Sequence, residues 1–559
     1  MVNDSGADYC HPDLVGTWAY IDDTASPYYG LPQMFDSLTS YLAARDFYLA
    51  ETNIAENFTR SQWADTSATA GGDFSYQPLG ADAAHNYTVT GTSLSGEYHY
   101  GSHPDSSLAD LAGLLSAFFG DGTAVDGERA AVLVVDENEA GVYDTVYVDL
   151  NFNFDFSDDT PARLSRDFSN SEVACLDYNG DGLNDVSGGL VYFIADGETA
   201  VPTLDWYWGV PGDFYGNGDL VAFHVMDYLA SAGGNHGMGC TSVAVGQGVV
   251  RGSLVFGPDG YPVADNQGLV VGPGKDVKTT QNGDYYNTPF IEDAYIYAGL
   301  GYDGEVGTGD DIQIVSNSWG FSGTDNDGFD FESRLIDLIN RTLAPNTALL
   351  FSTGNGAAGY GTAAPPAPMN GIGVGASTLY GSTGEFETIE SADQILGGDA
   401  MSWSNRGPGP GGQLGADILA TGAFGTGSVE LNAVLDGSVA TLSFGGTSMA
   451  APVAAGNLAL MYQAWEEATG EWPTFDEAKA LLQSTAKDAS HDIWSQGAGI
   501  VDADRGTMVA SGEGGFMAFP SAGASVTIVA PNTRLSPISS SRADPIPRPS
   551  CCTTSAAKM

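Results

Sequence analysis

Basic residues are scarce in this chain of 559 residues. Lysine and arginine together number 18, against 71 aspartates and glutamates, and the formal net charge is −53 at pH 7. A surface this acidic repels nucleic acid and anionic membranes, so we expect neither as a partner. Saline surroundings screen such self-repulsion, which favours an exported prokaryotic protein, secreted or at the cell surface, in marine or saline water. Compositional drift is the alternative explanation.

Cysteines and long apolar runs are also few. No stretch has the length and apolar character of a membrane span, and no signal peptide is visible. The cysteines show no dense spacing, so the sequence implies no disulfide framework. Their positions are Cys10, Cys175, Cys240, Cys551 and Cys552. Residues 532–559 change composition abruptly towards serine and proline, and we expect this tail to be disordered.

The most specific segment is GGTSMAAP, residues 445–452, which runs into a stretch of small apolar residues. A serine at the start of a helix lies beside unpaired N–H groups and the positive end of the helix dipole, which can hold a developing oxyanion. A simple helix cap is the alternative for Thr447 or Ser448. The full octapeptide resembles the nucleophile motif of the subtilisin-like serine peptidases. The resemblance implies that Ser448 is a nucleophile.

Two upstream segments resemble the other parts of that family's triad. NHGMGCTSVAVG, around His236, is similar to the histidine block, although Gly239 stands where the family usually has a second histidine. In some subtilases the position of Cys240 holds a buried free cysteine under the active site. The order of aspartate, histidine and serine along the chain is that of subtilisin.

The aspartate block lies at the start of the chain. VNDSGADYCHPDL, residues 2–14, resembles it and implies that Asp4 orients His236. Asp136 is the competitor, because it ends the apolar run AAVLVVD, but it lacks the following Ser/Thr-Gly and HPDL. A subtilase normally has a full strand before this aspartate, so we expect the chain to be truncated at its start.

Three further blocks resemble parts of a subtilase site. STGNG, residues 352–356, is similar to the oxyanion block, which implies that Asn355 donates its amide to the tetrahedral intermediate. SNSWG is similar to the substrate-binding strand, whose backbone pairs with the peptide as an added strand. Its residues are Ser316, Asn317, Ser318, Trp319 and Gly320. WSNRGP, residues 403–408, is another recognisable subtilase block.

The resemblance implies an α/β fold, with a subtilisin-like parallel sheet flanked by helices. Asp4 and His236 are 232 residues apart, so a large mixed α/β insertion must separate them. Helical spacing over residues 107–119 and apolar–polar alternation over 142–156, which predicts β-structure, both fall within it. We expect four segments: 1–20, the truncated start of the catalytic domain; 21–218, the insertion; 219–505, the catalytic domain; and 506–559, a linker and the start of a C-terminal region.

The insertion also contains DYNGDGLND, residues 177–185. Its oxygens recur at alternate positions around a glycine turn, which suits a calcium loop. The ligands would be Asp177, Asn179, Asp181 and Asp185. Gly188 occupies the twelfth position, so this is not a full EF-hand loop, and an acidic turn is the alternative.

These features together predict a serine endopeptidase that acts on proteins or peptides without a catalytic cofactor. The long insertion resembles the tripeptidyl-peptidase II and pyrolysin branch, so a tripeptidyl exopeptidase is the second hypothesis. That branch anchors the substrate's free amine with two glutamates; Glu292 matches one, but Phe321 occupies the position of the other. A catalytically silent surface or binding protein is the third. The sequence leaves the oligomeric state open.

Overall fold

The computed structural model describes most of the chain between residues 1 and 529. The described residues are 1–26, 29–33, 35–37, 40–41, 44, 47, 67–70, 72–89, 93–104, 106–163, 172–201, 204–224, 236–249, 279–281, 291–321, 326–356, 359–364, 366, 368, 370–378, 398–423, 425–436, 440–521 and 525–529. The expected disordered tail, 532–559, lies outside them. Among the described residues, no helix combines the length and apolar character needed to cross a membrane.

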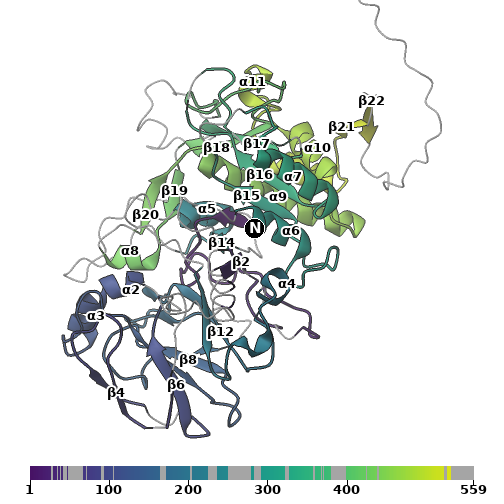
Figure 1. The fold of residues 1–559 in the computed structure, drawn as a ribbon. Helices are drawn as coiled ribbons and strands as arrows, with labels where there is room; N and C mark the ends of the chain where they lie inside the picture. The colour runs from purple at the N-terminus through teal and green to yellow at the C-terminus, as the bar shows by residue number, and fades with distance from the viewer. Residues whose placement is uncertain are drawn as a thin grey trace, which may run out of the picture.

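A seven-stranded sheet forms the centre of the larger body (Figure 1). Its order is β18-β17-β16-β15-β1-β14-β2, and every neighbouring pair is parallel. The predicted α/β fold with a parallel sheet is therefore confirmed. The strands are β1 (Val2–Asp4), β2 (Phe35–Asp36), β14 (Thr279–Gln281), β15 (Ile314–Asn317), β16 (Ala348–Ser352), β17 (Ile372–Thr378) and β18 (Ile418–Ala423).

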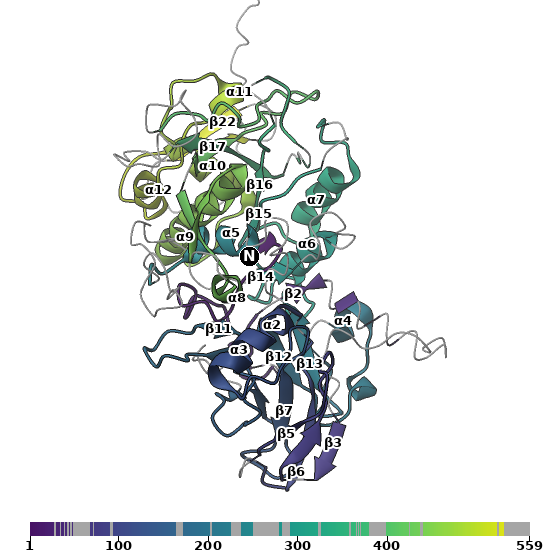
Figure 2. The same ribbon diagram turned by 90° about the vertical axis from the view of Figure 1, so that its left-hand side faces the viewer.

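Helices cover both faces of this sheet, with α6 and α7 on one side and α9 and α12 on the other (Figure 2). Successive side chains of β16 point to opposite faces of the sheet. Leu349 packs with α6 and α7, whereas Leu350 packs with α9 and α10. Burial on both faces explains why the strands read as apolar runs. The helices are α5 (His236–Val245), α6 (Ile291–Leu300), α7 (Phe331–Thr342), α8 (Leu431–Leu435), α9 (Thr447–Thr469), α10 (Phe475–Thr485), α11 (Ile493–Gln496) and α12 (Ala503–Ala510).

The insertion builds a second sheet with its own core. This sheet has the order β3-β6-β7-β8-β9, and all its pairings are antiparallel. Val132, Leu133 and Val134 of β7 are fully buried in its core. Its elements are β3 (Ser67–Ala70), β6 (Glu97–Ser102), α2 (Ser106–Asp110), α3 (Ala112–Phe119), β7 (Ala131–Val135), β8 (Thr145–Val148) and β9 (Ala162–Arg163). The two helices agree with the helical spacing over 107–119.

The predicted β-structure over residues 142–156 is only partly correct. The strand β8 ends at Val148, and a loop follows. The alternating polar residues there do not face solvent from a strand; they accept backbone N–H groups, as Asp149 does from Asn153 at 3.0 Å and Asn153 does from Asp155 at 2.8 Å. Oxygens of nearby side chains therefore accept the backbone N–H groups that a neighbouring strand would otherwise have bonded.

Smaller elements complete the structure. β2 pairs with β14 in the central sheet. β13 pairs with β12 in a separate two-stranded sheet. The expected segment boundaries stay predictions. The remaining elements are β4 (Phe74–Tyr76), β5 (His85–Tyr87), β10 (Cys175–Leu176), β11 (Val186–Ser187), β12 (Leu190–Ile194), α4 (Leu204–Trp208), the 3-10 helix η3 (Gly212–Phe214), β13 (Leu220–His224), β19 (Gly425–Ser428), β20 (Thr441–Phe444), β21 (Met517–Ser521) and β22 (Ser525–Val529).

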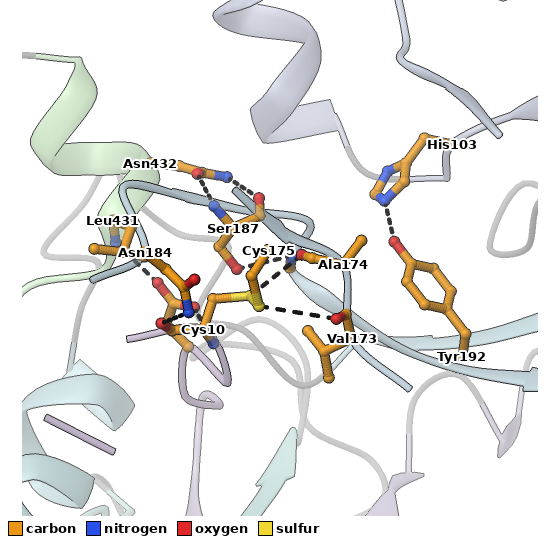
Figure 3. The surroundings of a disulfide bond; sticks show 12 residues. Cys10, His103, Val173, Ala174, Cys175, Asn184, Ser187, Tyr192, Leu431 and Asn432 are labelled. Atoms are coloured by element: carbon orange, nitrogen blue, oxygen red, sulfur yellow. Dashed lines mark hydrogen bonds between the residues drawn. A yellow bond between two sulfur atoms is a disulfide. The ribbon is translucent and has the colours of Figure 1, made fainter. Parts of the chain in front are cut away.

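A disulfide joins Cys10, in the loop after β1, to Cys175 of β10, a pair that the spacing of the cysteines did not indicate (Figure 3). The two cysteines are 165 residues apart, so only the fold brings them together. Close by, Asn432 of α8 exchanges two hydrogen bonds with the backbone of Ser187, at 3.1 and 2.9 Å. The Asn184 side chain donates to the carbonyl of Cys10 at 2.9 Å. The insertion is thus fastened to the loop that follows the predicted catalytic aspartate.

Candidate active site

His236 begins helix α5, and its ring faces the aspartate at the end of β1. Nδ1 of His236 lies 2.8 Å from Oδ1 of Asp4. The backbone N–H of Ser5 donates to the same oxygen at 2.8 Å, which holds the carboxylate beside the ring. The helix comes so close that a Cβ at Gly237 would stand 2.2 Å from the carbonyl oxygen of Gly6. Glycine at this position therefore permits the Asp–His contact.

The two side chains shift each other's proton affinity. Burial opposes ionisation of Asp4, but the charge and hydrogen bond of His236 outweigh it and lower the pKa of Asp4. Burial alone would lower the pKa of His236, yet the charge and hydrogen bond of Asp4 raise it well above its ordinary value. The pair therefore stabilises a protonated imidazole, the form that arises when a histidine accepts a proton during catalysis.

Cys240 lies one turn along α5 from His236, buried and free of any disulfide. Its Sγ lies 3.8 Å from Nδ1 of His236 and 3.3 Å from the carbonyl oxygen of Ser448. Burial, followed by the charge of Asp4, raises the pKa of the thiol to about 11, so it stays protonated. Its S–H donates to the carbonyl of Ser448, because Nδ1 of His236 already bonds to Asp4, and the protonated thiol does not act as a nucleophile.

Ser448 is the second residue of α9, the long helix against which α5 packs. Its Oγ donates to the carbonyl oxygen of Ser318 at 3.3 Å. In return, Oγ of Ser318 donates to the carbonyl oxygen of Ser448 at 2.8 Å. The predicted nucleophile is therefore joined directly to the predicted substrate-binding segment. Gly446, just before α9, has φ +115°, a backbone conformation that suits glycine at this tight entry to the helix.

Asn355 lies over the start of the same helix. Its Oδ1 accepts hydrogen bonds from the backbone N–H and the hydroxyl of Thr447, at 2.8 and 2.9 Å. With Oδ1 held in this way, the amide nitrogen is oriented as well, and a Cβ added to Gly446 would stand 3.2 Å from it. An amide donor fixed near the first N–H groups of a helix is the arrangement that an oxyanion requires.

Asn405 positions the loop that carries Asn355, a role that the motif WSNRGP did not reveal. Its Oδ1 accepts from the N–H of Gly356 at 2.8 Å, and its Nδ2 donates to the carbonyl of Thr353 at 3.0 Å. Asn405 is 5% exposed, so both bonds are shielded from water. The two bonds span the loop on either side of Asn355 and restrict its movement.

Asn317, predicted within the substrate-binding strand, turns its side chain into the protein. Its Oδ1 accepts from Asn3 at 2.9 Å and from the Tyr295 hydroxyl at 3.0 Å. Its Nδ2 donates to the carbonyl of Leu350 at 3.0 Å. The buried amide thereby ties β15 to β1, β16 and α6, so any contact of this residue with a peptide is left to its backbone.

The family model of peptidase S8, described as the subtilase family, matches residues 215–501, just over half of the chain. The chain belongs to the subtilase family. Subtilases are serine-type peptidases, and their substrates are proteins or peptides. The match covers the segments that hold His236, Asn355 and Ser448.

Solved structures similar to part of this subtilase include proteases. One is the self-cleaved protease domain of PatA, with 18% identity and a TM-score of 0.34 over 50% of this chain and 83% of that one. Another is a protease from Pseudoalteromonas arctica PAMC 21717, with 21% identity and a TM-score of 0.33; the match covers 53% of this chain and 74% of that one. A third is the prenylagaramide maturation protease PagA, with 20% identity and a TM-score of 0.32; the match covers 50% of this chain and 83% of that one.

Asp136, the competing aspartate, has other partners in this subtilase. Its carboxylate accepts from the hydroxyl of Ser93 at 2.7 Å and from the N–H groups of Ser95 and Gly141 at 3.1 and 2.6 Å. Burial would raise its pKa, but these hydrogen bonds lower it to about 2. All three partners belong to turns of the insertion, so the side chain fastens local structure there.

Glu292 lies in the first turn of α6, and its carboxylate is partly buried. Burial raises its pKa, and the negative charges of Glu332 and Asp293 raise it further. Glu332 is in the first turn of α7, which packs against α6. A second glutamate therefore lies near Glu292, although the family pattern would place it at Phe321.

The predicted calcium loop closes on itself through hydrogen bonds. Asp177 accepts from the N–H groups of Gly180 and Gly182, at 2.7 and 2.8 Å. Asp185 accepts from the Tyr178 N–H at 3.2 Å, and burial with the charges of Asp181 and Asp177 raises its pKa to about 6. These contacts gather the acidic side chains around one turn. A loop of this kind suits calcium but equally describes an acidic turn.

Proposed function

We propose that this subtilase is a serine endopeptidase with Asp4, His236 and Ser448 as its triad. The observation that carries the proposal is the 2.8 Å contact between Asp4 and His236, next to helix α9, whose second residue is Ser448. Cys240 links the histidine and the backbone of the serine, which keeps the two helices α5 and α9 in register. Asn355 supplies an amide donor beside the same helix start.

The proposed reaction is an acyl transfer in two steps. Ser448 Oγ attacks the peptide carbonyl while the ring of His236 accepts its proton; the carbonyl oxygen becomes an oxyanion, bound by Asn355 Nδ2 and a backbone N–H of the helix start. The protonated ring then gives its proton to the leaving amine, and water releases the acyl group by the same route. Asp4 orients the ring throughout. No metal or organic cofactor takes part in these steps.

Substrate binding must change the contacts of Ser448. Its Oγ donates to the carbonyl of Ser318, so attack requires the hydroxyl to turn away from that acceptor and towards His236. A peptide that pairs with residues 318–320 as an added strand would engage the same backbone. The proposal thus couples occupancy of the substrate strand to release of the nucleophile.

A tripeptidyl exopeptidase of the tripeptidyl-peptidase II and pyrolysin type is the second candidate. The observation that favours it is that Glu292 and Glu332 stand in the first turns of the neighbouring helices α6 and α7. Two carboxylates can hold a substrate's free amine by charge-assisted hydrogen bonds. The endopeptidase remains the first proposal, because the triad contacts support it without any anchor for a free amine.

One experiment separates these candidates. A long internally quenched peptide is offered with a free amine and with an acetylated amine, and the products are sequenced by mass spectrometry. An endopeptidase cleaves both peptides at internal bonds at similar rates. Release of tripeptides from the free amine alone, abolished by Glu292→Gln, would establish the exopeptidase. Failure to cleave either peptide or to react with a fluorophosphonate would favour a silent binding protein.

The remaining proposals concern the location of the enzyme, a structural calcium ion and the domain organisation. The net charge of −53 supports a secreted or cell-surface enzyme in saline water. The loop formed by Asp177, Asn179, Asp181 and Asp185 supports a structural calcium ion. We also propose an insertion subdomain with its own core between two parts of the catalytic domain, with the C-terminal region beginning after residue 505.

A further inference from the structure

A second acidic loop lies in the insertion, between β8 and β9, and we call residues 149–159 the acidic loop. Its sequence, DLNFNFDFSDD, places oxygen-bearing side chains at four alternate positions and at the last two. These residues are Asp149, Asn151, Asn153, Asp155, Asp158 and Asp159. Alternate oxygen-bearing side chains on a tight loop are the donor pattern of calcium sites, but the pattern alone does not make a site.

The loop curls around the side chain of its first residue. Oδ1 and Oδ2 of Asp149 accept the N–H groups of Asn153 and Phe154, at 3.0 and 3.1 Å. The backbone has φ +53° at Phe152 and +66° at Phe154, a left-handed conformation that such residues rarely adopt. The chain accepts this strain in order to wrap its backbone around a fully buried carboxylate.

A carboxylate without a partner lies in the same place. Asp159 is 7% exposed, and its Oδ2 makes no hydrogen bond within the described part of the chain. Burying an unpaired carboxylate oxygen costs several kcal/mol unless a proton or a cation compensates. Next to it in the chain, Asp158 accepts a hydrogen bond from Asn153 Nδ2 at 2.9 Å, so the end of the loop folds back on its centre. The unpartnered group therefore lies at the end of the loop that also holds the buried carboxylate of Asp149.

Negative charge accumulates around this point. The acidic loop carries Asp155 and Asp158 besides the buried Asp149 and Asp159, and it contains no lysine or arginine. Glu128 is 1% exposed and has His85 at 2.9 Å, which offsets its own charge only when that ring is protonated. In the part of the chain that the structure describes, none of the acidic loop's carboxylates pairs with a lysine or an arginine.

We propose that the acidic loop binds a calcium ion, with the carboxylates of Asp149 and Asp159 as its principal ligands. Amide oxygens of Asn151 and Asn153 and carboxylates at the rim would complete an oxygen-only shell. Calcium accepts six to eight such oxygens in irregular geometry, whereas magnesium demands a near-ideal octahedron. Three carboxylate oxygens of the loop do not all lie within 4.8 Å of one another, so binding requires side chains to rotate inwards.

The position of the acidic loop indicates what the ion would stabilise. The loop exchanges hydrogen bonds with Thr88, which donates to the Phe154 carbonyl at 2.9 Å and accepts from the Phe156 N–H at 3.1 Å. The phenylalanines between its polar residues, Phe152, Phe154 and Phe156, are buried in the insertion's core. A bound ion would therefore fasten this core, and would do so independently of the loop at 177–185.

The test is calcium titration of the full chain after treatment with EDTA, followed by calorimetry and by melting temperature at constant ionic strength. The expected result is a binding event that raises Tm with calcium but not with magnesium. Asp159→Asn should weaken that event at least tenfold, and should raise Tm in EDTA because a buried charge is removed. Hydrogen exchange should show calcium-dependent protection of residues 145–163.

Asp177→Asn combined with Asp181→Asn is the matched control, because it disables the other loop and leaves the acidic loop intact. The proposal predicts that the control keeps the binding event and the protection of residues 145–163. Retention of wild-type calcium binding by Asp159→Asn would overturn the proposal, as would equal stabilisation by calcium and magnesium. If Asp159→Asn fails to fold, Asp155→Asn at the rim replaces it and should weaken binding to a smaller extent.

Discussion

Pro452 stands four residues after Ser448 in α9 and leaves the Ser448 carbonyl without its helical donor. Two side chains from other elements take that place: the Ser318 hydroxyl at 2.8 Å and the Cys240 thiol at 3.3 Å. A proline near the beginning of the helix thus frees one acceptor, and that acceptor joins α9 to β15 and α5. The helical hydrogen bond that Pro452 cannot make is thus replaced by bonds that join Ser448 to the substrate-binding segment and to α5.

This arrangement makes a specific prediction about Ser318. Removing its hydroxyl in Ser318→Ala takes away the shorter of the two donors, and should cost about 1 to 2 kcal/mol of stability. We expect lower kcat as well, because the start of α9 loses its tie to β15. The double variant with Pro452→Ala supplies a backbone N–H to the same carbonyl and should recover most of the lost Tm. Additive losses in the double variant would contradict the role given to Pro452.

The nucleophile is tested by Ser448→Ala. The change should lower kcat by roughly 10⁶, with Tm and circular dichroism unchanged, because the hydroxyl contributes little to folding. Fluorophosphonate labelling should disappear together with activity. Ser318→Ala is a suitable companion, since it removes a hydroxyl from the same contact yet should still be labelled. Persistent labelling of the Ser448→Ala protein would remove Ser448 from the proposed mechanism.

The two aspartates are separated by a pair of isosteric changes. Asp4→Asn should leave inhibitor binding nearly intact but lower kcat by on the order of 10⁴, because an amide favours the wrong tautomer of the histidine. Asp136→Asn should affect stability more than rate, since its carboxylate accepts three hydrogen bonds in turns of the insertion. The opposite ranking of rates would place the catalytic carboxylate in the insertion.

The pH dependence follows from the raised pKa of His236. Only the neutral ring can accept the serine proton, so kcat/KM should fall as the pH falls through the pKa of this histidine. Because the charge of Asp4 overcomes burial and raises that pKa, the acid limb should lie above the ordinary histidine value of 6.5. In Asp4→Asn the limb should move to lower pH. A limb that stays in place would show that another group controls it.

The motifs at the site were readable because each one is local. GGTSMAAP, STGNG and the histidine block carry their residues within a few positions, and the fold places Asn355 beside Thr447 at the start of α9. The sequence could not show that Asn405 braces the oxyanion loop, or that Cys10 meets Cys175, because these partners are far apart along the chain. Tertiary packing brings such pairs together, and no repeating pattern in the sequence marks them.

The acidic loop was misread for a different physical reason. Alternation of polar and apolar residues has the same period in a half-buried strand and in a loop whose side chains take turns accepting N–H groups. After Val148 the phenylalanines do enter the core, as strand residues would, but Asp149 is buried with them. An aspartate or asparagine at each polar position between Val148 and Phe156, residue types that are depleted in strands, was the signal in the sequence that could have distinguished the loop.

The last prediction concerns the loop of residues 352–356, for which Asn355 and Asn405 have different roles. Asn355→Ala removes the proposed donor and should lower kcat by about 10² to 10³ with little change in KM, as loss of one oxyanion donor does. Asn405→Ala removes the bonds to Gly356 and Thr353, and should lower both kcat and Tm because the loop loses its brace. The diagnostic difference is stability: Asn405→Ala should melt earlier than Asn355→Ala, although Asn405 lies farther from the chemistry. If Asn355→Ala instead raised KM and left kcat unchanged, Asn355 would bind the ground state, and the oxyanion would need another donor.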